Sequence, residues 1–223
     1  MNLVKNFLAW MIRTGSRVIC LIDPVSLERV PEHGPLILVI NHINSLEVPL
    51  LAAYLHPRKL IGLAKVETWD NRFMGWLFDL WEAIPIRRGE LDLDAARRCL
   101  KTLKSGEILV VAPEGTRSYS GALQRGEPGI AMFALRSGAP ILPVAHWGGE
   151  KVGQNIRKLK RTDFHIRVGE PFTVDIGSEK ENGVMRQHVS DEIMQQLARL
   201  MPAEYQGEYA GNNSSRLKFL QFI

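Results

Sequence analysis

Six short runs of apolar residues, separated by segments with helical spacing, constrain the fold of this chain more than any other feature. Each run has four to six residues and contains Ile, Leu or Val at several positions, which is typical of buried strands. The runs occupy residues 36–40, 60–64, 83–86, 107–112, 140–145 and 164–169. Apolar residues recur at helical spacing in 46–55, 74–81, 92–104, 128–137 and 184–200. This alternation predicts an α/β fold with a mixed, mostly parallel sheet flanked by helices.

The length of the chain suits one domain. At 223 residues it can bury one sizeable core, and we expect that core within residues 23–201. Residues 202–223 have the composition of a loop until a short apolar end, so we expect this C-terminal tail to be weakly ordered.

The N-terminal segment, residues 1–22, has the pattern of an amphipathic helix. Lys5 and Arg13 interrupt its apolar residues, and no run approaches the roughly 20 apolar residues of a transmembrane helix. A secretory signal peptide would need a longer uninterrupted apolar core. Trp10 and the nearby cations suit a membrane interface. The same pattern would also suit a helix that packs its apolar face on the domain, and the sequence leaves both interpretations open.

The net charge indicates the kind of partner, and the two cysteines indicate the cellular compartment. Lys and Arg number 28 against 24 Asp and Glu, and the net charge of +4 suits an anionic partner such as a phospholipid surface. Cys20 and Cys99 lie in apolar helical patterns, which indicates small core residues in a reducing compartment. The chain has neither a glycine-rich phosphate loop nor the aromatic and basic motifs of nucleic-acid-binding modules. We therefore expect neither a glycine-loop nucleotide-binding protein nor a nucleic-acid-binding module.

Polar residues follow four of the six predicted strands, at the point where each strand ends. They are Asn41-His42, Arg87-Arg88, "PEGTRS" at 113–118 and His146-Trp147. In open α/β sheets, binding sites collect beyond the carboxyl ends of the strands. The four clusters together predict one site at this edge of the sheet.

His42 and Glu47 stand close to the first of these strand ends, five positions apart. In one regular helix, the two side chains would point about 140° apart and could not pair. They can meet only if the chain bends between them. We therefore expect a strand, a short turn and the start of a helix.

The segment "PEGTRS" is typical of a turn after a buried strand. Gly115 can adopt backbone angles closed to other residues, Thr116 offers a hydroxyl, and Arg117 offers a planar fork suited to phosphate. Glu114 would repel phosphate, so we expect it to hold an arginine or the turn in place. A plain capped turn with a surface arginine is the alternative.

Four motifs in this order resemble the glycerolipid acyltransferases, the family of 1-acyl-glycerol-3-phosphate acyltransferase. They are "NH-x₄-E", "IPIRRG", "APEGTRS" and "APILPVAHWG", within roughly residues 35–170. The resemblance implies transfer of a fatty acyl group from acyl-CoA or acyl carrier protein to the hydroxyl of a lysophospholipid. It also implies a site at a membrane surface that needs no metal and no cofactor. We accordingly expect a peripheral protein on the cytoplasmic face of the cell membrane.

The resemblance also implies roles for individual residues. His42 would be the general base that removes the hydroxyl proton, and Glu47 would fix its tautomer and stabilise the imidazolium. Arg88 matches the arginine of the second motif and would bind the acceptor phosphate. The remaining substrate-binding residues would be Glu114, Gly115, Thr116 and Arg117.

The chain departs from the family pattern at two positions. Glu47 replaces the usual Asp, and Ala112 replaces the usual aromatic residue. With these changes, the acceptor could be another lysolipid or a lipid without phosphate, or the protein could be a non-catalytic lipid-binding protein on the same fold.

Two further surfaces have open interpretations. Residues 68–81 are either core or part of an acyl-chain groove or membrane-facing ridge, and the basic stretch 151–161 is either a headgroup contact or a solvated loop.

Overall fold

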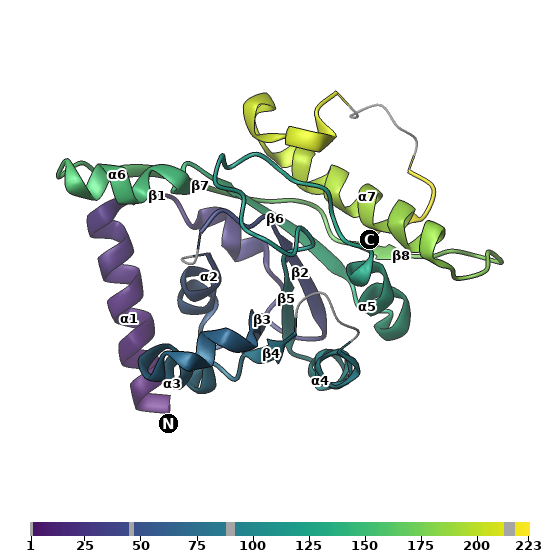
Figure 1. Cartoon of the computed structure of the whole chain (residues 1–223), viewed down its shortest axis with the longest axis horizontal. Coiled ribbons are helices and arrows are strands. Elements are labelled where there is room, and N and C mark those ends of the chain that lie inside the picture. The colour runs from purple at the N-terminus through teal and green to yellow at the C-terminus, as the bar shows by residue number, and fades with distance from the viewer. Residues whose placement is uncertain (1, 45–46, 88–91, 212–216) are drawn as a thin grey trace.

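The computed structural model describes residues 2–44, 47–87, 92–211 and 217–223. Within these residues a nine-stranded sheet forms the centre of the molecule, and helices cover both of its faces (Figure 1). Helices α1, α2 and α3 lie on one side of the sheet, and α4, α5 and α7 lie on the other.

The sheet is mixed and mostly parallel, which confirms the predicted fold class. Its order is β1-β7-β6-β2-β5-β3-β4, with β8 beside β6 and β9 beside β8. Pairs β1·β7, β2·β6, β2·β5, β3·β5 and β3·β4 are parallel, whereas β6·β7, β6·β8 and β8·β9 are antiparallel. The strands are β1 (Cys20–Ile22), β2 (Leu36–Ile40), β3 (Leu60–Lys65), β4 (Ile84–Ile86), β5 (Ile108–Val111), β6 (Ile141–Trp147), β7 (Thr162–Val168), β8 (Phe172–Val174) and β9 (Leu220–Phe222).

All five predicted helices are present, within two residues of their expected starts. Asn71, Asp92 and Asn182 cap α3, α4 and α7 with side-chain oxygens that accept backbone N–H groups, as expected of helix N-caps. The α-helices of the described residues are α1 (Asn2–Ile19), α2 (Glu47–Leu55), α3 (Arg72–Leu80), α4 (Leu93–Lys104), α5 (Gly129–Ser137), α6 (Val152–Arg157) and α7 (Gly183–Leu200).

Alternate residues of the central strands enter two separate cores. In β2, Ile37 and Val39 pack in the core that includes α4, α5 and α7, whereas Leu36, Leu38 and Ile40 pack in the core that includes α2. A parallel strand covered on both faces must be apolar at every position. This requirement explains why β2 and β5 are buried at every residue, and why the sequence shows them as continuous apolar runs.

Three strands and one α-helix of the described residues were absent from the sequence-based expectation. Strands β1, β8 and β9 have three residues each, and α6 occupies part of the basic stretch 151–161.

The described part of the C-terminal tail, which was expected to be weakly ordered, contains secondary structure. It forms the 3₁₀ helices η4 (Ala203–Tyr205) and η5 (Gly207–Tyr209), and β9 pairs with β8 while Phe219 is buried. These elements depend on partners that are remote in the sequence, so local patterns do not reveal them.

The N-terminal segment is helical, as expected, and α1 packs along α2. Ala9 and Ser16 are buried on the packed side, and the Arg13 guanidinium donates to the carbonyl of Ala53. Leu3, Phe7 and Trp10 remain exposed on the outer side. None of the helices within the described residues combines the length and the apolar character that a membrane crossing requires.

Residues 68–81 lie mostly at the surface. Of the residues in α3, only Gly75 is buried, whereas Phe73 and Trp76 are exposed. Most of this aromatic stretch is therefore not core.

Gly148, directly after β6, is a point where only glycine fits. Its φ is +84°, and a Cβ atom there would lie 2.0 Å from the backbone carbonyl oxygen of Asp163.

Gly148→Ala should lower the free energy of unfolding by about 1–3 kcal/mol more than Gly106→Ala. Gly106 has a φ of +76° with no atom within 4 Å of the added Cβ, so it reports the cost of the backbone angle alone. Urea denaturation of both variants measures the difference, and equal losses would contradict the steric explanation.

Candidate active site

Three of the four polar clusters lie at the carboxyl ends of neighbouring strands. Strands β6, β2 and β5 are adjacent in the sheet, and they lead into His146, His42 and the "PEGTRS" loop. The fourth cluster follows β4 at the sheet edge, separated from β2 by β5 and β3. Arg87 is exposed there, and Arg88 lies outside the described residues.

His42 and Glu47 meet, as the bend between strand and helix predicted. Strand β2 ends at Ile40 and α2 begins at Glu47, so the pair spans a turn. His42 Nδ1 lies 3.4 Å from Glu47 Oε2, and the two side chains are 21% and 1% exposed. Neither atom has a hydrogen-bond partner of good geometry. The imidazole and the carboxylate therefore lie in close contact at a distance slightly long for a hydrogen bond, and such contacts often shorten when substrate binds.

The second oxygen of Glu47 accepts backbone hydrogen bonds and faces a second histidine. Oε1 accepts from the N–H of Asn44 at 2.5 Å and from that of Ile43 at 3.3 Å. His146 Nε2 lies 3.4 Å from the same oxygen. Burial would raise the pKa of Glu47, but His146, His42 and the Asn44 N–H outweigh it and lower that pKa to about 2. The carboxylate is consequently charged at neutral pH.

The loop after β5 fixes the backbone of His42 on both sides. The His42 N–H donates to Glu114 Oε1 at 2.7 Å, and the His42 carbonyl accepts from the Ser118 N–H at 2.7 Å. Glu114 is buried, and its Oε2 accepts from the backbone N–H of Gln124 at 2.9 Å. Burial raises the pKa of Glu114, although these hydrogen bonds oppose the rise. Glu114 thus holds the turn, which was one of its two expected roles.

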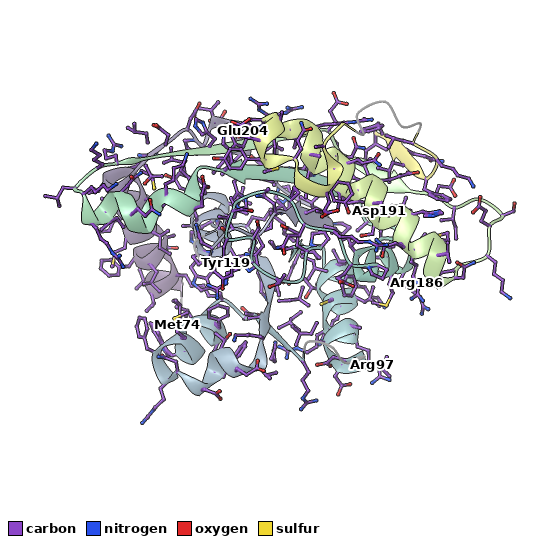
Figure 2. All side chains as sticks on the ribbon, turned by 45° about the horizontal axis from the view of Figure 1, so that its top comes forward. Met74, Arg97, Tyr119, Arg186, Asp191 and Glu204 are labelled. Carbon is purple, nitrogen blue, oxygen red and sulfur yellow. The ribbon has the colours of Figure 1, made fainter. Side chains whose placement is uncertain are left out.

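Gly115, Thr116 and Arg117 form the exposed tip of the same loop. Gly115 has a φ of +64°, and its N–H closes the turn on the Ala112 carbonyl. The Arg117 guanidinium carbon lies 5.9 Å from the centre of the Tyr119 ring. Figure 2 shows Tyr119 on this loop, near the middle of the view. The tip is therefore accessible to a ligand, as its predicted substrate-binding role requires.

His146 and Asn41 were expected only as polar residues at strand ends, and the structure shows that they contact each other and that His146 contacts Glu47. Asn41 is buried; its side-chain amide donates to the His146 carbonyl at 2.8 Å, and its side-chain oxygen accepts from the His146 N–H at 2.9 Å. In the sequence, His146 stands at the end of an apolar run, as His42 does, and this position was the evidence that it could belong to the site. Asn41 precedes His42 directly, so one short segment positions both histidines.

The C-terminal segment supports the loop from the other side. The Leu123 N–H donates to the Tyr205 carbonyl at 2.9 Å, and the Gly126 N–H donates to Tyr209 Oη at 3.0 Å. The Tyr205 hydroxyl donates to Glu150 Oε1, just after β6. Glu204 marks this segment in Figure 2, at the top of the view. Residues far apart in the sequence thus hold the loop that carries Glu114.

Comparison with known proteins gives several acyltransferases. The chain is 29% identical over 148 residues to the 1-acyl-sn-glycerol-3-phosphate acyltransferase of Pseudomonas aeruginosa, covering 65% of this chain and 56% of that protein. It is 27% identical over 146 residues to the Bacillus subtilis enzyme of the same name, covering 65% and 70%. It is also 32% identical over 112 residues to the lyso-ornithine lipid O-acyltransferase of Pseudomonas aeruginosa, covering 50% and 42%. The match with two of these three relatives spans less than two thirds of their length.

A solved structure shares the fold, and a family model covers the site. The crystal structure of the 1-acyl-sn-glycerophosphate acyltransferase of Thermotoga maritima matches with a TM-score of 0.61 at 21% identity, over 88% of this chain and 80% of that one. The family model described as Acyltransferase matches residues 22–147, more than half of the chain. Its range includes His42, Glu47, the "PEGTRS" loop and His146. This chain belongs to the Acyltransferase family.

Proposed function

We propose that this protein is an O-acyltransferase that moves a fatty acyl group from acyl-CoA or acyl carrier protein to the free hydroxyl of 1-acyl-glycerol-3-phosphate, in phospholipid biosynthesis. The observation that carries the proposal is the partly exposed His42 imidazole, backed by the buried Glu47 carboxylate at 3.4 Å. Relatives named 1-acyl-sn-glycerol-3-phosphate acyltransferase support this acceptor.

The chemistry follows from the side of the ring that Glu47 occupies. Nδ1 faces the carboxylate, which leaves Nε2 for the acceptor hydroxyl. As the hydroxyl oxygen attacks the thioester carbonyl, His42 takes its proton and Glu47 stabilises the resulting imidazolium. The carbon–sulfur bond then breaks, and His42 returns the proton to the departing thiolate. A new ester and a free thiol result, with no proton gained or lost overall.

The exposed tip of the "PEGTRS" loop is the proposed place for the acceptor phosphate. Arg117 presents a planar guanidinium that can bind phosphate through two parallel hydrogen bonds. Thr116 and the backbone of Gly115 lie beside it in the chain. The proposed role of Arg88 in the same recognition rests on its sequence motif alone.

A lyso-ornithine lipid is a second candidate acceptor, because one relative that acts on it, according to its name, is 32% identical over the matched 112 residues. Such an acceptor lacks the phosphate that Arg117 would bind. The acyl-transfer chemistry at His42 would be the same for both acceptors. The rates measured with each acceptor therefore distinguish the two candidate functions.

We also propose that α1 holds the protein on the cytoplasmic face of the cell membrane. Its outer side exposes Phe7 and Trp10, whose rings lie 6.0 Å apart. The exposed Phe73 and Trp76 of α3 form a second aromatic pair, and Lys5 of α1 bridges to Glu82 just after α3. An amphipathic helix with exposed aromatic residues and nearby cations binds the interface of a lipid bilayer. A lipid acceptor would then be delivered from the same surface.

The proposed activity is tested by incubating the purified protein with labelled acyl-CoA or acyl carrier protein. The acceptors are 1-acyl-glycerol-3-phosphate, lyso-ornithine lipid and lysophosphatidylcholine. We expect turnover to be highest with 1-acyl-glycerol-3-phosphate, and His42→Ala should reduce it by about 10²–10⁴-fold, the usual contribution of a general base. His33→Ala, at a histidine exposed to solvent, is the matched control. A folded protein without turnover on any acceptor would contradict the proposal and favour a lipid-binding role.

Glu114→Gln should lower kcat about 10- to 100-fold and leave the acceptor KM nearly unchanged, because Glu114 holds the backbone of His42. The glutamine amide would present an NH₂ group to one of the two backbone N–H groups that Glu114 now accepts. The resulting shift misplaces the base, and small displacements of reacting groups are costly. Glu32→Gln, at an exposed carboxylate, is the control. Steady-state kinetics decide the question, since a raised acceptor KM with normal kcat would assign Glu114 to substrate binding.

Replacing Phe7 and Trp10 together with Ser should weaken binding to vesicles of phosphatidylcholine and phosphatidylglycerol at least about tenfold. Burying one aromatic side chain contributes roughly 1.5–3 kcal/mol, and about 1.4 kcal/mol corresponds to a factor of ten. Leu93→Ser with Val184→Ser is the control, because both residues are exposed and belong to α4 and α7 on the opposite face of the sheet. Vesicle sedimentation measures the binding. Unchanged binding would move the membrane contact to another surface, with 151–161 as the next candidate.

A further inference from the structure

His146 is a buried histidine with an unsatisfied ring nitrogen. It lies in β6, is 2% exposed, and its Nε2 has no hydrogen-bond partner of good geometry. A buried polar atom without a partner costs free energy, so its presence needs an explanation. The nearest charged group is informative, because Nε2 lies 3.4 Å from Glu47 Oε1.

The position and orientation of the His146 ring are fixed from two sides. Asn41 holds its backbone N–H and carbonyl with two hydrogen bonds. The ring stacks on Phe164 of β7, with centres 5.9 Å apart and planes 10° from parallel. Phe164 stacks on the His146 ring, and the Nε2 edge of that ring faces the Glu47 carboxylate. His146 is therefore held against Glu47.

The Glu47 carboxylate lies between two imidazoles, one at each oxygen. Oε2 faces His42 Nδ1, and Oε1 faces His146 Nε2, both at 3.4 Å. In the described residues, no three His, Cys, Asp or Glu side chains are placed to hold a metal ion. The geometry places one ring nitrogen beside each oxygen of the carboxylate.

We propose that His146 is a positioning residue for acyl transfer, whose Nε2–H holds one oxygen of Glu47 so that the other remains directed at His42. This inference rests on the proposed function. His146 does not reach the substrate, because it is buried behind the carboxylate, and it acts on the reaction only through Glu47.

The charge state of Glu47 should depend on His146. Burial is the largest influence on the pKa of Glu47 and raises it, and His146 is the first of the groups that oppose the rise. Within the described part of the chain, the ionisable groups in contact with the cluster are Glu47 of α2, His42 after β2 and, through the His42 backbone, Glu114 after β5. Asn41 and Phe164 face His146 with uncharged groups. Without the imidazole, the pKa of Glu47 should rise, and the carboxylate should lose its charge at a higher pH.

Two substitutions of His146 separate this role from simple packing. His146→Phe keeps the ring that stacks on Phe164 but has no donor, whereas His146→Gln loses the ring but carries a donor on a side chain of similar reach. We expect the Phe variant to lose about 10- to 100-fold in kcat, by analogy with residues that orient the ligands of a metal site. Its KM values should stay near those of the wild type, and the acid limb of its kcat/KM profile should move to higher pH. The Gln variant should retain most of the rate, with the acid limb unmoved.

The reverse order would overturn the proposal. A Phe variant near the wild-type rate, with a Gln variant that is strongly impaired, would show that His146 contributes only its ring. Circular dichroism and thermal unfolding confirm that both variants fold. In a Glu47→Gln background, His146→Phe should cause little further loss, because its effect passes through Glu47. A full additional loss in that background would contradict an action through Glu47.

A measurement without substrate separates this inference from the proposed function. In protein labelled with ¹⁵N-histidine, the ring-nitrogen NMR signals of His42 report its contact with Glu47. We expect His146→Phe to shift these signals between pH 5 and 8, and His146→Gln to leave them close to those of the wild type. Unchanged His42 signals in the Phe variant would overturn the inference, whether or not the protein transfers acyl groups. A shift in a protein without turnover would leave the positioning intact and contradict only the proposed function.

Discussion

A buried negative charge on Glu47 is the constraint on which the site depends. Its side chain is 1% exposed, and an ionised carboxylate removed from water is stable only where donors replace the lost hydration. Two such donors are the backbone N–H groups of Ile43 and Asn44 before α2. The ring nitrogens of His42 after β2 and His146 in β6 lie 3.4 Å from the two carboxylate oxygens. The charge therefore requires two strands and one helix to keep a fixed arrangement, and the parallel centre of the sheet provides it.

Where the pairing between β2 and β6 ends, side chains take over the hydrogen bonding of the backbone. Pairing between β2 and β6 ends at Ile40 and Val144. Beyond that point, Asn41 takes over the backbone N–H and carbonyl of His146, and Glu114 and the Ser118 N–H take over those of His42. Buried backbone groups need such partners wherever strands diverge. Here the partners that satisfy the backbone also place the two imidazoles of the candidate site.

The sequence predicted what depends on local pattern, and it missed what depends on distant partners. Strand β2 and the bend between His42 and Glu47 could be predicted because burial and helical geometry act over a few residues. Strand β9 could not, since its pairing with β8 joins segments about fifty residues apart. His146 was visible only as a polar residue at a strand end, and its contact with Glu47 arises from the adjacency of β6 and β2. That adjacency is a property of the sheet order, which apolar runs do not specify.

The glutamate at position 47, where the motif resemblance led us to expect aspartate, fits a carboxylate shared between two rings. An additional carbon–carbon bond of about 1.5 Å extends the reach of the acid from α2 toward both strands. His146 lies beside one oxygen of Glu47 and leaves the other directed at His42, so the carboxylate charge faces the ring that becomes an imidazolium in the proposed reaction. Such a charge is in place before the proton moves, and no reorganisation of water is needed at that step. The cost is carried in the folded protein as a buried carboxylate, and the hydrogen bonds that offset this cost also fix the geometry of the base.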